Sequence, residues 1–158
     1  MSKPAVFTAL FALFLTAFVC PAQAGPNFSG DWKMNIAKSD FGPVPAPEVL
    51  TRSIKHHDPT LEISTHQKGA RGEVNSELKY TTDGKPCVNT VQGAEAKGVA
   101  KWNGDSLTIE SERDFQGTAI TATEVWTLSD GGKTLTIKNH VTVPKQGEYD
   151  LKYVFDKQ

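Results

Sequence analysis

Turn residues recur at short intervals along most of this chain, and this spacing constrains its fold more than any other feature. From Asn27 onward, short segments of alternating apolar and polar residues are separated by glycine-containing turns such as Asp83-Gly84 and Asn103-Gly104. Asn-Gly and Asp-Gly favour the positive backbone angles that tight hairpins require. No segment shows the periodicity of an amphipathic helix. The pattern predicts an all-β domain.

Neighbouring segments are joined so closely that they are expected to pair as an antiparallel up-and-down meander. A sheet of about 8–10 strands curls and closes, which removes its edges. A barrel larger than about eight strands is too wide for its own side chains to fill, so an interior cavity is expected. The expected strands are 28–35, 50–57, 61–67, 74–81, 85–91, 96–102, 106–113, 118–128, 134–143 and 148–156.

Alternation separates inner from outer side chains, and the hairpin registers test that separation. A four-residue loop at 57–60 places Arg52 opposite Thr65 and Ile54 opposite Ile63. The next hairpin then places Ser76 beside Thr65. Three successive strands therefore agree on which face is the inner one.

The C-terminal strands yield a row of polar side chains on an otherwise apolar face. The expected register places Glu124, Asn139 and Tyr153 in one row, with Trp126 beside Ile137 and Phe155. Apolar walls with a few polar groups are the usual composition of a small-molecule site. The expected ligand-binding residues of the barrel interior are Arg52, Thr65, Ser76, Arg113, Glu124, Trp126, Asn139 and Tyr153.

Two interpretations of the interior charges remain open. Arg52 and Arg113 suit a ligand carboxylate or phosphate, because the guanidinium fork binds such groups through paired hydrogen bonds. Alternatively, Arg113 lies in solvent at a strand end and Arg52 pairs with Glu124. An inward-facing Glu124 must be paired, hydrogen-bonded or protonated, and a raised pKa would make it a candidate general acid or base.

The segment 36–49 is the one long connection, and its alternating prolines Pro43, Pro45 and Pro47 prevent a helix. They favour an extended arm or lid. Residues 25–158 are otherwise expected to form a single β-barrel domain.

The first 24 residues have the features of a cleaved secretory signal peptide. A charged start at Lys3 precedes a short apolar run and the small residues Ala22 and Ala24. The run is too short to span a bilayer, which needs about 20 residues, so no transmembrane segment is expected. The export route leads to the periplasm or the exterior. Lipid attachment at Cys20 is the weaker alternative, because Phe18-Val19 is bulky for that processing.

Composition excludes several classes of function. The net charge is −1, with no basic cluster for nucleic acid. Cys87 is the one cysteine after residue 24, so no internal disulfide is expected, and it is interpreted as a half-buried filler. His56 alone among the four histidines points inward. No catalytic motif is present, so neither an enzyme nor a metal or other cofactor is expected.

Phe28-Ser29-Gly30-Asp31-Trp32-Lys33 resembles the opening strand of the calycins, the group that includes lipocalins and fatty-acid-binding proteins. There Gly-x-Trp begins the first strand, and the tryptophan plugs the closed end of the barrel. The resemblance implies a small secreted bacterial calycin-like barrel in which Gly30 and Trp32 close one end.

The chain departs from both branches of that group. Segment 36–49 replaces the helix pair of fatty-acid-binding proteins, and Leu151-Lys152-Tyr153 retains only the tyrosine of their Arg-x-Tyr. No arginine follows Arg113 to stack on the tryptophan, as one does in lipocalins. The main hypothesis is an exported lipocalin-like protein that binds a small apolar or amphiphilic molecule inside the barrel. The alternative is a non-catalytic interaction module of the cell envelope without such a ligand.

Overall fold

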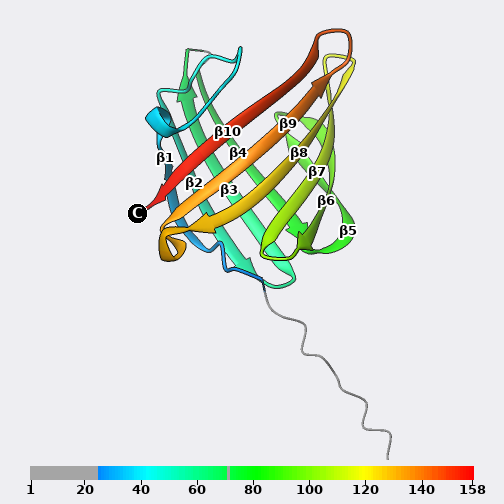
Figure 1. The fold of residues 1–158 in the computed structure, drawn as a ribbon. Helices are drawn as coiled ribbons and strands as arrows, with labels where there is room; N and C mark the ends of the chain where they lie inside the picture. Colours follow the sequence, from blue (N-terminus) through cyan, green and yellow to red (C-terminus); the bar gives the residue numbers. More distant parts are fainter. Residues whose placement is uncertain (1–24, 71) are drawn as a thin grey trace, which may run out of the picture.

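The computed structural model describes residues 25–70 and 72–158 and consists of one ten-stranded antiparallel sheet curled into a barrel (Figure 1). The expected signal peptide and Cys20 lie outside the described residues. All ten expected strands are present within a few residues of their expected bounds. They are β1 Gly30–Met34, β2 Val49–His57, β3 Thr60–Gly69, β4 Gly72–Thr81, β5 Asp83–Val91, β6 Ala94–Asn103, β7 Ser106–Phe115, β8 Thr118–Ser129, β9 Thr134–Val143 and β10 Gly147–Lys157.

Tight hairpins hold consecutive strands in register. Between β7 and β8, Gln116 and Gly117 have φ values of 54° and 78°. Two successive positive φ angles make a turn whose twist matches that of paired strands. A single-turn 3-10 helix, η2 (Asp130–Gly132), makes the longer connection between β8 and β9.

The sheet closes through β1, which pairs with both β2 and β10. The strand order β4-β3-β2-β1-β10-β9-β8-β7-β6-β5 leaves one seam, between β4 and β5. Consecutive strands otherwise pair as the sequence predicts, so this seam is the one exception among the described strands. The Asn89 side chain bridges the seam: its Oδ1 accepts from the Lys79 backbone N–H at 2.7 Å, and its Nδ2 donates to the Lys79 carbonyl at 3.1 Å.

The apolar core fills one half of the barrel. Trp32 lies there with 1% of its surface exposed, and its Nε1 donates to the Phe28 carbonyl at 3.0 Å. The Phe28 ring packs edge-on against Trp126 and stacks on Trp102. The largest fully buried side chains are Trp32, Trp126, Phe28, Phe155, Leu61, Leu107, Leu135 and Ile137. We call this half the packed half.

A hydrogen-bond cluster around Asp58 ties the end of the packed half together. The Asp58 carboxylate accepts from the Thr82 hydroxyl at 2.6 Å and from Trp102 Nε1 at 3.3 Å. It also lies 3.0 Å from His56 Nε2, while His56 Nδ1 accepts from the Phe28 backbone N–H at 3.2 Å. Four separate segments are thereby joined at the closed end.

The proline-rich connection lies at the opposite end of the barrel, where it forms part of the rim (Figure 1). It begins with the 3-10 helix η1 (Ile36–Lys38), and Asp40 then bridges to Lys152 of β10. The Phe41 ring packs 5.8 Å from that of Tyr153. Residues 43–47 continue along the rim without a helix.

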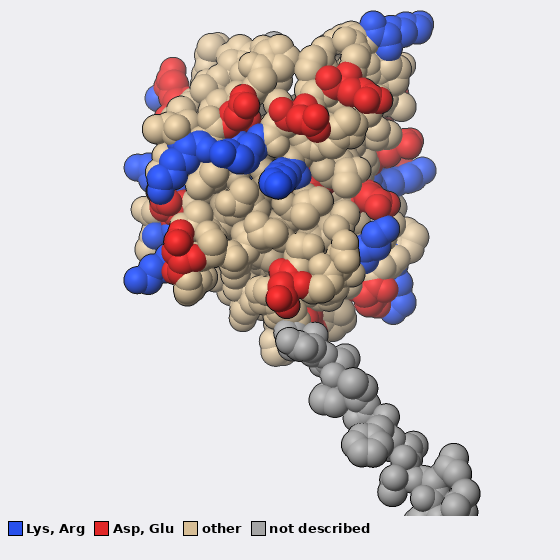
Figure 2. Space-filling view, in the orientation of Figure 1, with Lys and Arg blue, Asp and Glu red and all other residues tan. Residues whose placement is uncertain are grey.

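The surface carries no large cluster of one charge on the face that Figure 2 shows, where acidic and basic side chains are interspersed. Over residues 25–70 and 72–158, the structure has no helix long and apolar enough to cross a membrane.

Candidate functional site

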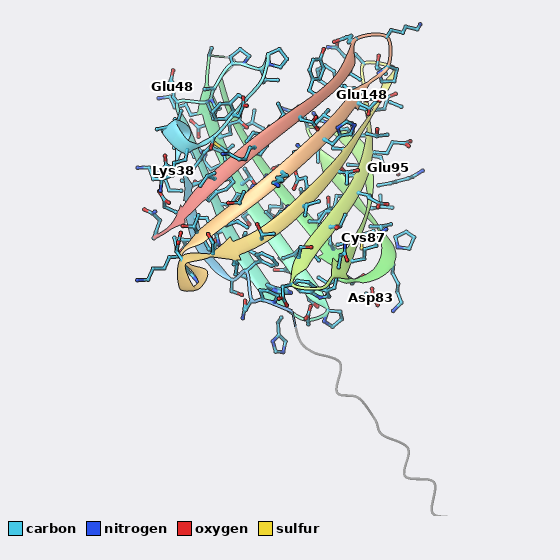
Figure 3. The ribbon with its side chains drawn as sticks, in the orientation of Figure 1. Lys38, Glu48, Asp83, Cys87, Glu95 and Glu148 are labelled. Atoms are coloured by element: carbon cyan, nitrogen blue, oxygen red, sulfur yellow. The ribbon has the colours of Figure 1, made fainter. Side chains whose placement is uncertain are left out.

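A cavity of about 920 Å³ occupies the half of the barrel opposite the packed half. It opens at the rim end, where Figure 3 shows Glu48 and Glu148, far from Asp83 at the closed end. The β3–β4, β5–β6, β7–β8 and β9–β10 hairpins and residues 43–47 all contribute to its wall. Its wall includes the apolar side chains of Val74, Val91, Ile120, Val141 and Leu151 together with Ser76 and Arg113.

On β9 and β10, the next inward-facing residue towards the packed half is polar instead of apolar. Asn139 follows Val141 inward along β9, and Tyr153 follows Leu151 along β10. Glu124 lies deeper than Ile120 on β8. We call this set the polar layer: Arg52, Thr65, Tyr80, Glu124, Asn139 and Tyr153. Along β9 and β10 this layer lies between the cavity wall and the packed half, and none of its six residues forms part of the cavity wall.

Arg52 projects from β2 over the aromatic side chains of the packed half. Its guanidinium carbon lies 5.4 Å from the centre of the Trp126 ring and 5.3 Å from that of Phe155. Cation–π contacts of this kind stabilise a partly desolvated guanidinium. Its Nε is buried and has no hydrogen-bond partner. No ion pair joins Arg52 to Glu124 among residues 25–70 and 72–158, so the alternative of a direct pair is wrong.

Glu124 is half-buried and is held by Trp126. The indole Nε1 donates to Glu124 Oε2 at 2.7 Å. This bond fixes the carboxylate at the boundary between the polar layer and the packed half. An indole donor satisfies one carboxylate oxygen, and charge-assisted bonds of this type are stronger than neutral ones.

The two tyrosines of the polar layer are held in the neutral form. Burial raises the pKa of Tyr80 to about 12, and the negative charge of Glu124 adds to the effect. Burial and Glu124 likewise raise the pKa of Tyr153, while Arg52 and the Asn139 side chain act in the opposite direction. Neither phenol therefore carries a charge at neutral pH.

The β2–β3–β4 register is as expected: Arg52 pairs with Thr65, and Thr65 with Ser76. The β8–β9 register is also as expected, with Glu124 opposite Asn139 and Trp126 opposite Ile137. Arg52 and Glu124 meet through Trp126, whose ring faces the guanidinium and whose Nε1 donates to the carboxylate.

The expected register between β9 and β10 is wrong by two residues. Tyr153 pairs with Ile137, and Leu151 with Asn139. The turn closes one residue earlier than expected, because the Gln146 N–H donates to the Val143 carbonyl and Lys145 takes a φ of 67°. A two-residue shift keeps the same face inward, so Tyr153 becomes a diagonal neighbour of Asn139. Phe155 correspondingly pairs with Leu135 instead of Ile137.

The remaining expected site residues fall at three depths. Ser76 and Arg113 contribute to the cavity wall, and Arg113 is exposed at the rim. Thr65 lies in the polar layer. Trp126 lies below it, fully buried, and contacts the layer through its ring and its Nε1.

Two residues of this region were absent from the sequence-based prediction. Tyr80 lies near the end of β4, and it shares a face with Leu78 because residues two apart in a strand point to the same side. Lys157 places its Nζ 5.2 Å from the centre of the Trp32 ring. This cation lies in the last strand, where the sequence contains no arginine.

The described residues contain no group of three or more His, Cys, Asp or Glu side chains suited to a metal ion. His56 is buried as expected and bonds to Phe28 and Asp58. His140 is exposed, and its hydrogen bond with Asp150 raises its pKa. Cys87 is half-buried and packs against the core cluster.

No family model and no curated protein matches the sequence. Solved structures with similar folds exist. A secretory abundant heat soluble protein from Ramazzottius varieornatus is 12% identical, with a TM-score of 0.61, over 85% of this chain and 98% of that one. Human cRBP IV is 14% identical, with a TM-score of 0.54, over 84% of this chain and 99% of that one.

A Schistosoma mansoni fatty acid binding protein in complex with arachidonic acid is 15% identical, with a TM-score of 0.50. The match covers 83% of this chain and 96% of that one. At these identities the similarity concerns the fold alone. The chain thus forms an almost closed antiparallel barrel that is similar in fold to these structures.

Proposed function

We propose that this protein binds a small apolar or amphiphilic molecule inside its barrel. The observation that carries the proposal is the cavity of about 920 Å³ at the rim end of the barrel, whose wall includes Val74, Ile120 and Val141. Pockets of roughly 300–1,000 Å³ with apolar walls and a few polar groups are typical of small-molecule sites. An apolar chain would lie against residues such as Val74, Ile120 and Val141, with its head towards Arg52.

The structural similarities support the same class of ligand. The similar protein from Schistosoma mansoni holds arachidonic acid, and a barrel of comparable architecture offers this chain the same kind of interior. Fold alone does not assign function, so the proposal depends on the cavity of this chain and on the polar layer below it.

Binding of the neutral fluorescent probe N-phenyl-1-naphthylamine tests the proposal. We expect saturable binding that is lost in the variant Ile120→Phe/Val141→Phe, because both changes fill the cavity wall. His140→Phe is the matched control, since it adds a phenyl ring to the outer face of the same strand β9. Equal binding by both variants would place the probe outside the barrel and contradict the proposal.

We also propose that residues 1–24 are removed on export, so that the mature chain begins at Gly25. A side chain at Gly25 would meet the Trp102 ring at 2.5 Å, so this glycine suits the close approach of the N-terminal segment to the closed end. N-terminal sequencing of the exported protein should read Gly-Pro-Asn-Phe. A sequence that begins upstream, or a lipid on Cys20, would contradict this processing.

A further inference from the structure

Two buried polar atoms of the polar layer have no hydrogen-bond partner, and they are of opposite kinds. Arg52 Nε is a donor, and Asn139 Oδ1 is an acceptor. The Asn139 side chain is 9% exposed, so its carbonyl has lost bulk water as a partner. Buried polar groups are almost always satisfied, and an unsatisfied one costs considerably more than a typical bond contributes. Both atoms therefore point to a missing partner.

The net charge of the polar layer restricts the charge of the missing hydrogen-bond partner. The Arg52 guanidinium lies over the Trp126 ring, and Glu124 Oε2 accepts from the Nε1 of the same indole. The two charges therefore lie close together and compensate each other, although no ion pair joins them among the described residues. A second anion would leave the desolvated layer with a net negative charge, which costs free energy in a medium of low polarity.

We propose that the polar layer selects an uncharged head group that both accepts and donates a hydrogen bond, such as the hydroxyl of a long-chain alcohol or a primary amide. The head group accepts from Arg52 Nε and donates to Asn139 Oδ1, and the alkyl chain extends along Val141 and Ile120 towards the rim. This inference rests on the proposed function. It assigns Asn139 as a specificity-determining residue and Glu124 as the residue that excludes carboxylates.

Four ligands with alkyl chains of similar length separate the effects of hydrogen-bond donation, hydrogen-bond acceptance and charge in the head group. They are 1-decanol, decanamide, decanoate and 1-methoxydecane. Decanol and decanamide accept and donate, methoxydecane only accepts, and decanoate is anionic at pH 7.4. Affinities are measured by displacement of N-phenyl-1-naphthylamine. We expect decanol and decanamide to bind about tenfold more tightly than methoxydecane or decanoate, since one satisfied buried hydrogen bond is worth about that factor.

Two substitutions test the assigned roles. Asn139→Leu removes the acceptor and is expected to erase the difference between decanol and methoxydecane, because neither can then donate to position 139. Retained affinity for methoxydecane shows that the variant is folded. Glu124→Gln removes the compensating anion and is expected to shift the decanol-to-decanoate affinity ratio at least tenfold towards decanoate. The circular dichroism spectrum of each variant checks that the fold is retained. Asn139→Ala provides a second variant without the acceptor in case Asn139→Leu does not fold.

The outcomes separate this inference from the proposed function. Tighter binding of decanoate than of decanol by the unmodified protein would overturn the inference and leave the proposed function standing. Equal affinity for decanol and methoxydecane would also overturn it, because Asn139 would then have no role in selection. Failure of all four ligands to bind would overturn both.

Discussion

The guanidinium carbon of Arg52 lies 5.4 Å from the centre of the Trp126 ring, at the boundary between the cavity and the packed half. The same indole donates its N–H to Glu124. Trp126 thus contacts both charges of the polar layer, through its face and through its edge. A fully buried tryptophan therefore fixes the floor of the candidate site without lining it.

Replacing both charges of the polar layer should stabilise the ligand-free protein. In the double variant Arg52→Met/Glu124→Gln, two partly desolvated charges are removed together, and replacing such charges with uncharged side chains is often neutral or stabilising. We expect the free energy of unfolding in urea to rise, while the selectivity for decanol is lost. Arg52→Met alone should be destabilising, because it leaves Glu124 without a compensating charge. A double variant less stable than both single variants would contradict this account.

Tyr80 should titrate well above an ordinary tyrosine. Its folded pKa of about 12 exceeds the unfolded value of 10, so the unfolded state loses its proton first as pH rises. The stabilisation, about 3 kcal/mol for two pKa units, is complete below pH 10 and is lost between pH 10 and about 12. Phenolate absorbance should show delayed titration that Tyr80→Phe reduces. An unchanged titration curve for that variant would refute the assignment.

Asn89 should be required for closure of the seam between β4 and β5. Asn89→Ala leaves the Lys79 backbone N–H and carbonyl without their partner, at a cost of about 1–3 kcal/mol. The Lys79 amide should also exchange its hydrogen faster than in the unmodified protein. Thr90→Ala, on the exposed neighbouring position, is the control and should change neither quantity. Unchanged Lys79 exchange in Asn89→Ala would show that the bridge is dispensable.

The Asp58 cluster should contribute to the free energy of unfolding at neutral pH, and this contribution should decrease in acid. Burial raises the pKa of Asp58, but hydrogen bonds from Thr82, His56 and Trp102 outweigh it and hold the pKa below 3.8. The contribution is present above the unfolded pKa and is lost as pH falls through the lower folded pKa. Asp58→Asn should cost about 1–2 kcal/mol at pH 7 and progressively less below pH 4.

Urea unfolding at a series of pH values measures this dependence. Asp105→Asn is the matched control, because Asp105 is exposed in a turn. A cost for Asp58→Asn that stays constant from pH 7 to pH 2 would contradict the role of the carboxylate.

Gly30 should tolerate no side chain without loss of stability. Its φ of 139° lies in a region that other residues rarely adopt, and an added Cβ would lie 2.6 Å from Lys157 Cε. The flexible lysine can move away, so backbone strain dominates the cost. We expect Gly30→Ala to lower the free energy of unfolding by about 1–3 kcal/mol, measured in urea. A variant as stable as the parent would show that β1 relaxes without strain.

The sequence predicts much of this fold because its signals are local. Turns such as Asn103-Gly104 mark the strand ends, and the period-two alternation places Arg52 and Glu124 on the inner face without knowledge of their neighbours. The β2–β3 register follows because its loop length is fixed. The resemblance of the opening strand to calycins led to the same architecture from a separate observation.

The sequence could not predict features set by tertiary contact. The β9–β10 register depends on the backbone conformation of Lys145, which composition leaves open. The seam between β4 and β5 arises where the barrel closes, and no local signal distinguishes that connection from a hairpin. Tyr80 pairs with Leu61, yet the charges of Glu124 and Arg52, from β8 and β2, both affect its pKa, and no local sequence signal shows this.

Native mass spectrometry of the mature protein, purified gently from the cells that make it and compared with a denatured sample, tests the central claim most directly. The account predicts a stoichiometric extra mass that disappears on denaturation and corresponds to an uncharged amphiphile. A bare protein mass, unchanged after incubation with long-chain alcohols, amides and acids, would contradict ligand binding in the barrel. It would favour the alternative of an interaction module of the cell envelope.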